Sequence, residues 1–239
     1  MTSHQIRGSG RASLLSIMSD PFICISFSQY GEDTLIAEYL SGKFFVQRSK
    51  FFVDIGAYHP SRFSNTKLLS MLGWTGINVD PNPDSISLFE KARPLDKNLN
   101  LGVSLMEGVS TLYRFSEGAF NTFDPLTAEK YIKEGCQFIG EHKVDSMTIN
   151  DLLEKYLPAD VKDVGIGFLD IDCEGLDSEI IDMLDIPRFN PLIIAAESHG
   201  FDPLCPLESR ICKKILPHGY VLAAYAGPTL LFWKKNPDL

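Results

Sequence analysis

The chain has 239 residues, of which 44% are hydrophobic and 22% charged, a composition that is typical of globular proteins and sufficient for one substantial core. Its formal net charge of −9 argues against nucleic acid as a partner, because an acidic surface repels a phosphate backbone. The five cysteines include no C-x-x-C pair, so we expect reduced thiols in a cytoplasmic protein rather than a disulfide framework or a zinc cluster.

The beginning of the chain predicts little regular structure. Residues 1–25 are mostly polar, and their apolar stretch LLSIM is too short for the core of a signal peptide. We therefore expect a mobile tail at 1–25 and a single domain at 26–239. No window contains the roughly 18 apolar residues of a membrane-spanning helix, so we expect no stable membrane insertion.

Apolar and β-branched runs that are bounded by turn residues predict the strands. In chain order these runs lie at 50–56, 75–81, 99–105, 110–115, 164–172, 191–198, 220–226 and 229–235. Helical periodicity falls between them, at 65–73, 82–93, 148–157, 176–185 and 206–216. Because most of the strands are apolar throughout and alternate with helices, we expect a mostly parallel sheet with helices on both faces.

The last two predicted strands meet across Gly227 and Pro228, which indicates an antiparallel hairpin at one edge of the sheet. A parallel sheet that ends in such a hairpin is typical of the methyltransferase variant of the doubly wound fold. We expect an α/β protein of this kind with a seven-stranded sheet. Residues 116–147 show little regular pattern, and two interpretations stay open for them: a lid or substrate loop, or a plain surface excursion.

The turn after the first predicted strand reads FVDIGAYHP. Ligands of open α/β sheets bind beyond the carboxyl ends of the strands, so Asp54 is placed to bind a polar group and Gly56 to permit a close approach. A dinucleotide site would need G-x-G-x-x-G to cradle a pyrophosphate, and this turn has Gly56 alone. A carboxylate at this position suits a ligand with a positively charged amino group.

The next strand ends at Asp80, where a carboxylate can accept the two hydroxyls of a ribose. S-adenosylmethionine is a ligand that requires one acid for an ammonium group, another for a ribose, and no phosphate cradle. The alternative is that Asp54 and Asp80 only cap their loops.

Several blocks carry a resemblance. They are SQYGEDTLIAEYL at 28–40, FVDIGAYHPSRFSNTKLL with the following GWTGINVDPNP, LNLGVS at 99–104 and FLDIDCEGLDSEII at 168–181. Together they resemble the FkbM-type family of S-adenosylmethionine-dependent methyltransferases, over roughly residues 26–200. The resemblance implies a Rossmann-like methyltransferase fold and, usually, O-methylation of sugars or of natural-product hydroxyls. The second glycine of most methyltransferase loops is replaced here by YHP, a variant that occurs within the FkbM group.

Carried over position by position, the resemblance implies a cofactor site, to which we add Asp170 from the predicted strand at 164–172. The segment SQYGED would wrap the site, and DIGA would lie near the methionine part. SNT would contribute at the start of the next helix, and the residues after the second and third strands would lie near ribose and adenine. The predicted cofactor-binding residues are Gln29, Gly31, Glu32, Asp54, Gly56, Ala57, Ser64, Asn65, Thr66, Asp80, Asn82, Ser104 and Asp170.

Methyl transfer to a hydroxyl needs a group that removes the proton of the acceptor. The strand at 164–172 ends in LDIDCEG, where period-two alternation places Asp170 and Asp172 on one face and Glu174 follows at the turn. The next strand ends in AAESHG, which adds Glu197 and His199. We expect these residues to gather beside the methyl group.

Two readings of this cluster stay open. In the first, Asp172 and Glu197 bind Mg²⁺ or another divalent cation, and His199 is the base. In the second, no metal binds, and His199 or His59 takes the proton while the acids, Glu174 among them, orient the sugar. Simpler roles also stay open: Glu174 as a helix-start acid, His59 as a packing residue and His199 as an ordinary loop residue.

The sequence therefore predicts an S-adenosylmethionine-dependent O-methyltransferase that acts on a hydroxyl of a sugar or glycan. The alternatives are a nucleotide-sugar oxidoreductase or epimerase, and a non-catalytic methyltransferase-like binding module. The expected partners are a small-molecule or glycan substrate and no nucleic acid, with a homodimer left open.

Overall fold

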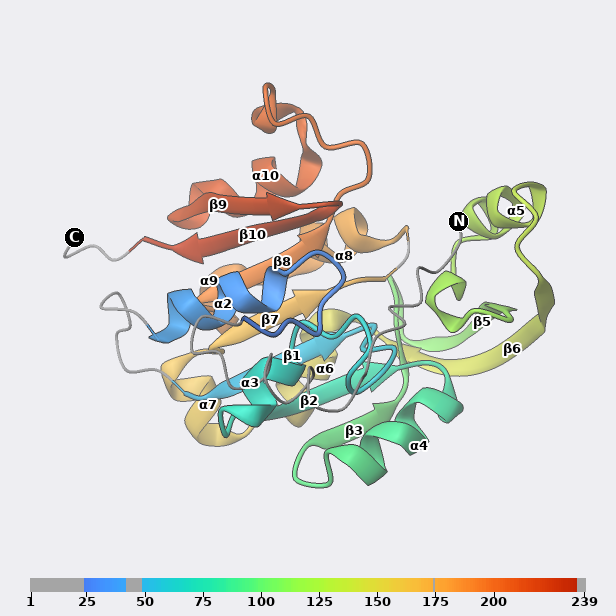
Figure 1. Ribbon diagram of the computed structural model, residues 1–239, viewed down its shortest axis with the longest axis horizontal. Helices are drawn as coiled ribbons and strands as arrows, with labels where there is room; N and C mark the ends of the chain where they lie inside the picture. The colour runs from blue at the N-terminus through green and yellow to red at the C-terminus, as the bar shows by residue number, and fades with distance from the viewer. Residues whose placement is uncertain (1–23, 42–48, 174, 236–239) are drawn as a thin grey trace, which may run out of the picture.

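The computed structural model describes residues 24–41, 49–173 and 175–235. A seven-stranded sheet with the order β3-β2-β1-β7-β8-β10-β9 runs through its centre (Figure 1). The first five of these strands are parallel, whereas β10 is antiparallel to both of its neighbours. The strands are β1 (Phe51–Ile55), β2 (Thr75–Asp80), β3 (Lys97–Asn100), β7 (Phe168–Ile171), β8 (Ile193–Glu197), β9 (Tyr220–Ala226) and β10 (Thr229–Lys234). The predicted α/β fold with an antiparallel C-terminal hairpin is confirmed.

Helices cover both faces of this sheet. One face packs against apolar residues of α6 to α10, such as Leu152, Ile180 and Ile211, and the other packs against Ile36 of α2 and Leu69 of α3. The helices are α2 (Glu32–Ser41), α3 (Lys67–Met71), α4 (Pro83–Ala92), α6 (Ile149–Tyr156), α7 (Ala159–Val164), α8 (Asp177–Met183), α9 (Ile186–Phe189) and α10 (Arg210–Ile215), with the short turns η2 (Pro206–Glu208) and η3 (Leu216–His218). In the described part of the chain, no helix has both the length and the apolar character to cross a membrane.

A second, three-stranded sheet with the order β4-β6-β5 stands beside the main one (Figure 1). We call residues 102–147, which contain it, the lobe. The lobe consists of β4 (Gly102–Val103), β5 (Gly108–Phe115), η1 (Gly118–Phe120), α5 (Pro125–Lys133) and β6 (Phe138–Met147).

The lobe corrects two details of the sequence prediction. The single strand expected at 99–105 is divided between β3 and β4, which belong to different sheets, and only Leu101 separates them. The segment 116–147, whose sequence shows little regular pattern, contains α5 and the ten-residue strand β6. Most side chains of β6 are exposed, so it lacks the apolar alternation that reveals a half-buried strand.

Strand register places polar side chains in one row across the main sheet. Asn98 pairs with Asn78, Asn78 with Asp54, and Asp54 with Asp170. Side chains at paired positions of parallel strands lie on the same face, about 4.8 Å from one strand to the next. These four residues therefore form a polar row, on the face that α2 and α3 cover.

The turn after β1 requires a glycine because two strand ends converge there. Gly56 has a φ of +80°, and a Cβ atom at this position would lie 1.7 Å from the carbonyl oxygen of Asp172. The amide of Asp172 in turn donates to the carbonyl of Ile55. The close approach that Gly56 permits is thus to the end of β7, and it holds the two central strands together at the edge where ligands bind.

We expect Gly56→Ala to lower the free energy of unfolding by at least about 3 kcal/mol, because the added methyl group overlaps backbone that cannot move away. Urea denaturation would measure this. Gly73→Ala is the matched control: Gly73 has nearly the same φ, +81°, but no atom within 4 Å of the added Cβ. The control should lose only the strain of left-handed backbone, about 1 kcal/mol. Equal losses for the two variants would contradict the overlap.

Candidate functional site

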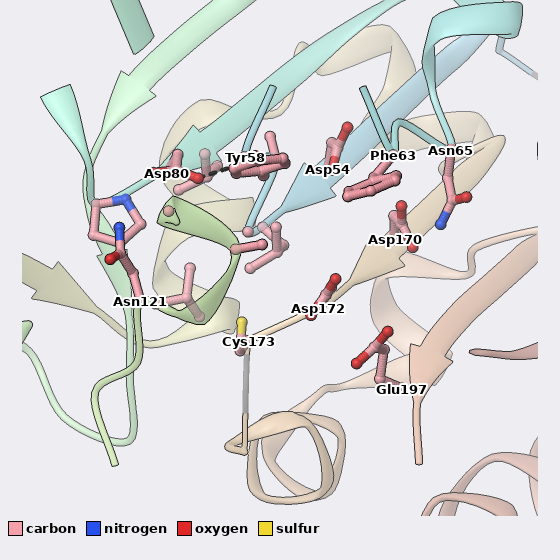
Figure 2. Close-up of a pocket in the computed structure, with 18 of the residues that line it drawn as sticks. Asp54, Tyr58, Phe63, Asn65, Asp80, Asn121, Asp170, Asp172, Cys173 and Glu197 are labelled. Carbon is pink, nitrogen blue, oxygen red and sulfur yellow. Dashed lines mark hydrogen bonds between the residues drawn. The ribbon is translucent and has the colours of Figure 1, made fainter. Parts of the chain in front are cut away.

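A cavity lies at the carboxyl ends of β1, β2, β7 and β8. Its volume is about 1150 Å³ when the open mouth is included. Figure 2 shows Asp54, Asp80, Asp170, Asp172 and Glu197 around it. The lining residues are Gln29, Glu32, Asp54, Ile55, Gly56, Ala57, Tyr58, Phe63, Ser64, Asn65, Val79, Asp80, Pro81, Leu101, Val103, Leu112, Gly118, Ala119, Asn121, Thr122, Phe123, Asp170, Asp172, Cys173, Glu197 and Thr229.

The floor of the cavity includes two neighbouring acids of the polar row. Burial raises the pKa of Asp170 well above its usual range, and the adjacent Asp54 raises it further, while a hydrogen bond with Asn65 acts in the opposite direction. Burial also raises the pKa of Asp54, which a hydrogen bond from Thr66 and the charge of Arg93 partly offset. Two carboxyl groups this close resist joint ionisation unless a positive charge comes near.

Arg93 is a buried cation beneath this floor. Its guanidinium donates to Thr66 Oγ1 at 2.7 Å, to Ser64 Oγ at 2.9 Å and to the carbonyl of Pro60 at 2.6 Å. Thr66 Oγ1 in turn donates to Asp54 Oδ2 at 2.6 Å. The guanidinium therefore fixes the loop after β1 at several points and reaches the Asp54 carboxylate through one hydroxyl.

Asp80, at the end of β2, is held by backbone amides. The N–H of Asn82 donates to Oδ1 at 2.7 Å, and the N–H of Tyr58 donates to Oδ2 at 2.8 Å. Burial nevertheless raises the pKa of Asp80 to about 6, since these hydrogen bonds only partly offset the loss of water. The side chain of Ser85 makes a third hydrogen bond to this carboxylate, whose remaining lone pair can accept from a ligand in the cavity.

The segment before α2 closes one side of the cavity. Glu32 accepts from the N–H of Tyr30 at 2.7 Å and from Thr229 Oγ1 at 3.3 Å, and both Glu32 and Gln29 line the cavity. The ring of Tyr30 lies against Gly227, in the turn between β9 and β10. Residues from the two ends of the described chain thus meet at the site.

The lobe provides the opposite wall. The lobe residues that line the cavity are Val103, Leu112, Gly118, Ala119, Asn121, Thr122 and Phe123. The amide oxygen of Asn121 accepts from the N–H of Phe115 at 2.9 Å, which fixes that side chain against β5. Together with Leu101 and Pro81, these residues form a mostly apolar wall that faces Asp80.

Most of the predicted cofactor residues converge on this cavity. Those that line it are Gln29, Glu32, Asp54, Gly56, Ala57, Ser64, Asn65, Asp80 and Asp170. The other four do not, and each has a local structural partner: the Gly31 amide donates to Ser28, Thr66 binds Asp54, Asn82 caps α4, and Ser104 donates to the carbonyl of Met106.

The predicted catalytic residues are divided by the structure. Asp172 and Glu197 line the cavity, whereas His199 and His59 do not, and Glu174 lies outside the described residues. His199 is 66% exposed, with Nε2 3.4 Å from an oxygen of Glu197. It therefore lies behind a carboxylate that faces the cavity.

His59 has a different partner set. Its Nδ1 accepts from the amides of Ser61 and Arg62, at 3.1 and 3.0 Å, which stabilises the turn before α3. Burial lowers the pKa of His59, and the charges of Arg62 and Arg93 lower it further. These contacts suit a neutral structural histidine.

The remaining lining residues were not predicted. Phe63 and Tyr58 stand in the loop after β1, between residues that were predicted, and both have positive φ values, +57° and +52°. The lining residues between Gly118 and Phe123 were missed because segment 116–147 carries little periodic signal. The local feature that could have indicated them is the run GAFNTF at 118–123, in which small and polar residues stand beside two phenylalanines.

The charge of the lining is one-sided. Among the described residues, the lining contains Glu32, Asp54, Asp80, Asp170, Asp172 and Glu197 but no lysine, arginine or histidine. Such a cavity favours a cationic ligand and disfavours a pyrophosphate, which needs helix N-termini or basic side chains. The described residues contain no group of three or more His, Cys, Asp or Glu arranged to hold a metal ion, so binding of a divalent cation by Asp172 and Glu197 stays a prediction.

Comparison with known proteins gives a family. The model of the methyltransferase FkbM domain matches residues 54–222, which is most of the chain. The crystal structure of a methyltransferase FkbM from Methylobacillus flagellatus KT is similar with a TM-score of 0.44 and 14% sequence identity. That match covers 87% of this chain and 48% of the other, so this chain spans about half the length of that protein. No match was found among curated proteins.

We expect the buried Asp80 to make the ligand-free protein less stable as the pH rises from about 5 to about 7. Its folded-state pKa, about 6, lies above the ordinary value of 3.8, so the folded state binds more protons than the unfolded state between these values. The contribution of Asp80 to the free energy of unfolding is complete at low pH and is lost as the pH rises through 6. The loss for this group is roughly 1 kcal/mol.

Urea denaturation at both pH values would measure the loss, and Asp80→Ala should remove about that amount of the pH dependence. The control is Asp84→Ala, which removes an exposed carboxylate at the start of α4. An unchanged pH dependence in Asp80→Ala would contradict the assignment.

Proposed function

The chain belongs to the methyltransferase FkbM domain family, and from this premise we propose that it is an S-adenosylmethionine-dependent O-methyltransferase that acts on a hydroxyl of a sugar or glycan. The observation that carries the proposal is the cavity, to which the described part of the chain contributes six carboxylates and no basic side chain. S-adenosylmethionine bears a sulfonium, an ammonium and one carboxylate, and therefore enters such a cavity as a cation.

The ribose and adenine of the cofactor fit the side of the cavity that faces the lobe. Asp80 is oriented by two backbone amides and by the side chain of Ser85, and it keeps a lone pair for a ribose hydroxyl. Pro81, Val103 and Phe123 offer apolar surface for a flat base, and Asn121 and Thr122 lie beside them. The turn after β1 offers no run of glycines for a pyrophosphate, which argues against a dinucleotide in the same place.

The methionine end of the cofactor fits the acidic floor. Asp54 and Asp170 are neighbours in register, and their pKa values are raised because both are buried. An ammonium group between them would favour the ionised form of both carboxylates. Glu32 and Gln29 close this end of the cavity, and the hydrogen bond between Asn65 and Asp170 holds the floor in place.

The acceptor is assigned to the side of Asp172, Glu197 and Phe63. Carboxylates accept hydrogen bonds from hydroxyl groups, and the face of an aromatic ring packs against the C–H groups of a sugar. Phe63 is 43% exposed and lines the cavity, and the Arg62 guanidinium lies 4.6 Å from its ring centroid, so the rest of the exposed ring surface is what an acceptor can contact. These features support a neutral, polyhydroxylated acceptor.

When bound, S-adenosylmethionine would supply a methyl group carried on a positively charged sulfur, and the leaving group would be the neutral thioether S-adenosylhomocysteine. The protein must align the acceptor and take its proton. We assign the alignment to Asp172 and the first proton acceptance to Glu197. His199 then receives that proton from Glu197 at 3.4 Å and, being exposed, releases it to solvent. In this proposal His199, the predicted base, acts through Glu197 and does not contact the acceptor.

Isothermal titration calorimetry tests the cofactor. We expect S-adenosylhomocysteine to bind and NAD not to bind. Asp80→Ala should weaken binding of S-adenosylhomocysteine by about 10- to 100-fold, because it removes hydrogen bonds to a charged acceptor. Asp84→Ala is again the control. Binding of NAD alone would indicate an oxidoreductase or epimerase, and binding of neither ligand would indicate a non-catalytic module.

Methyl transfer tests the proton path. A panel of glycosides, with mass spectrometry to detect a gain of one methyl group, would identify an acceptor. With that acceptor, we expect His199→Ala to lower kcat about 100-fold and to leave the affinity for S-adenosylhomocysteine unchanged. His142→Ala, which removes an exposed histidine of β6, should behave as the wild type. Full activity of His199→Ala would remove this histidine from the path.

A further inference from the structure

The lobe holds the loop after β1 through one cluster of three side chains. The hydroxyl of Tyr58 donates to Glu117 Oε1 at 2.6 Å, although the two residues are 59 positions apart. Arg62 donates to the Tyr58 oxygen at 2.8 Å and to Glu117 Oε2 at 3.1 Å. We call Tyr58, Arg62 and Glu117 the bridge cluster. It joins the segment just before η1 to the turn just after β1.

Tyr58 connects this cluster to Asp80. Its N–H is the donor to Asp80 Oδ2, and its backbone has a φ of +52°, in the left-handed region. For a residue other than glycine this conformation costs about 1–2 kcal/mol, so other contacts must maintain it. The side chain of Tyr58 has such a contact in Glu117. If that contact is lost, the backbone can relax, and its N–H no longer points at Asp80.

The strengths of the contacts within the bridge cluster are unequal. The ion pair of Arg62 and Glu117 is half exposed, and pairs of this kind contribute little to stability. The hydrogen bond from Tyr58 has an ionised acceptor, because the bond from the Tyr58 hydroxyl lowers the pKa of Glu117. Burial and Glu117 together raise the pKa of Tyr58 to about 12, so the hydroxyl stays a donor. The contact that matters is therefore the one between Tyr58 and Glu117.

We propose that Glu117 is a positioning residue for the cofactor: through Tyr58 it fixes the amide that orients Asp80, and thereby couples the lobe to ribose binding. Glu117 itself does not line the cavity, so it acts without touching the cofactor. The neighbouring Gly118 does line the cavity. It packs beside Tyr58, because a Cβ atom added to Gly118 would lie 3.4 Å from Cε2 of the Tyr58 ring. The inference rests on the proposed function, since it requires Asp80 to bind the ribose.

Calorimetry with S-adenosylhomocysteine tests the coupling on the full chain. Tyr58→Phe and Glu117→Ala should each weaken binding by about three- to tenfold, the value of one hydrogen bond. The double variant should be no weaker than the single variants, because both changes break the same contact. Glu117→Gln keeps an oxygen that can accept from Tyr58 and should retain most of the affinity. Glu141→Ala, which removes an exposed lobe carboxylate outside the cluster and the cavity, is the matched control and should change affinity by less than about twofold.

The same changes in an Asp80→Ala background show where the contact acts. There, Glu117→Ala should have no further effect on affinity, because the carboxylate that it positions is absent. A loss of affinity as large as in the wild-type background would overturn the inference, and so would wild-type affinity in Tyr58→Phe, which keeps the ring and is expected to fold. If the wild-type protein does not bind S-adenosylhomocysteine, the proposed function itself is wrong. If the wild type binds it and the variants bind it equally well, only the inference about Glu117 is wrong.

Discussion

The site depends on one buried cation. Parallel strands bring Asp54, Asp80 and Asp170 to the same edge of the sheet, and buried carboxylates repel one another unless something compensates their charge. Arg93 does so from below, through Thr66, while it also holds Ser64 and the carbonyl of Pro60. A buried guanidinium that makes several hydrogen bonds has one stable position. The loop after β1 is consequently built around Arg93.

The cavity above this floor has walls of two kinds. The acidic side is made of strand ends that the main sheet holds rigidly, and the apolar side is contributed by the lobe. The segment before α2 closes the third side, and three hydrogen bonds from Ser26, Phe27 and Ser28 to the Asp33 carboxylate anchor it. A charged group of a ligand would therefore contact carboxylates that the main sheet holds in place. A flat apolar group would contact side chains of the lobe.

The parts of the fold that sequence could predict are those with a strong periodic signal. The buried strands β1, β2, β7 and β8 are mostly apolar, and the acids at or near their ends were placed at one edge because parallel strands share an edge. In the lobe, β5 was predicted at 110–115, whereas β6 and η1 gave no such signal, since β6 is mostly exposed and η1 is a single turn. Sequence also could not tell residues in the cavity from residues just behind it. Thr66, Asn82 and His199 stand within two positions of lining residues, but their side chains bind protein groups instead.

The passage of the chain from one sheet to the other has a consequence for how proteins of this shape can vary. Only Leu101 lies between β3 and β4, and it is itself part of the cavity wall, with its amide bound to the carbonyl of Asp80. Extra residues at this junction would displace the wall. The turn between α5 and β6 contains the exposed residues Glu134 and Gly135, and a Cβ atom added to Gly135 would have no neighbour within 4 Å. Because exposed turns of this kind accept insertions, we expect it to tolerate a change of length. We therefore expect insertions and deletions among proteins of this architecture to gather at that distant tip, where new recognition surface can arise without rebuilding the pocket.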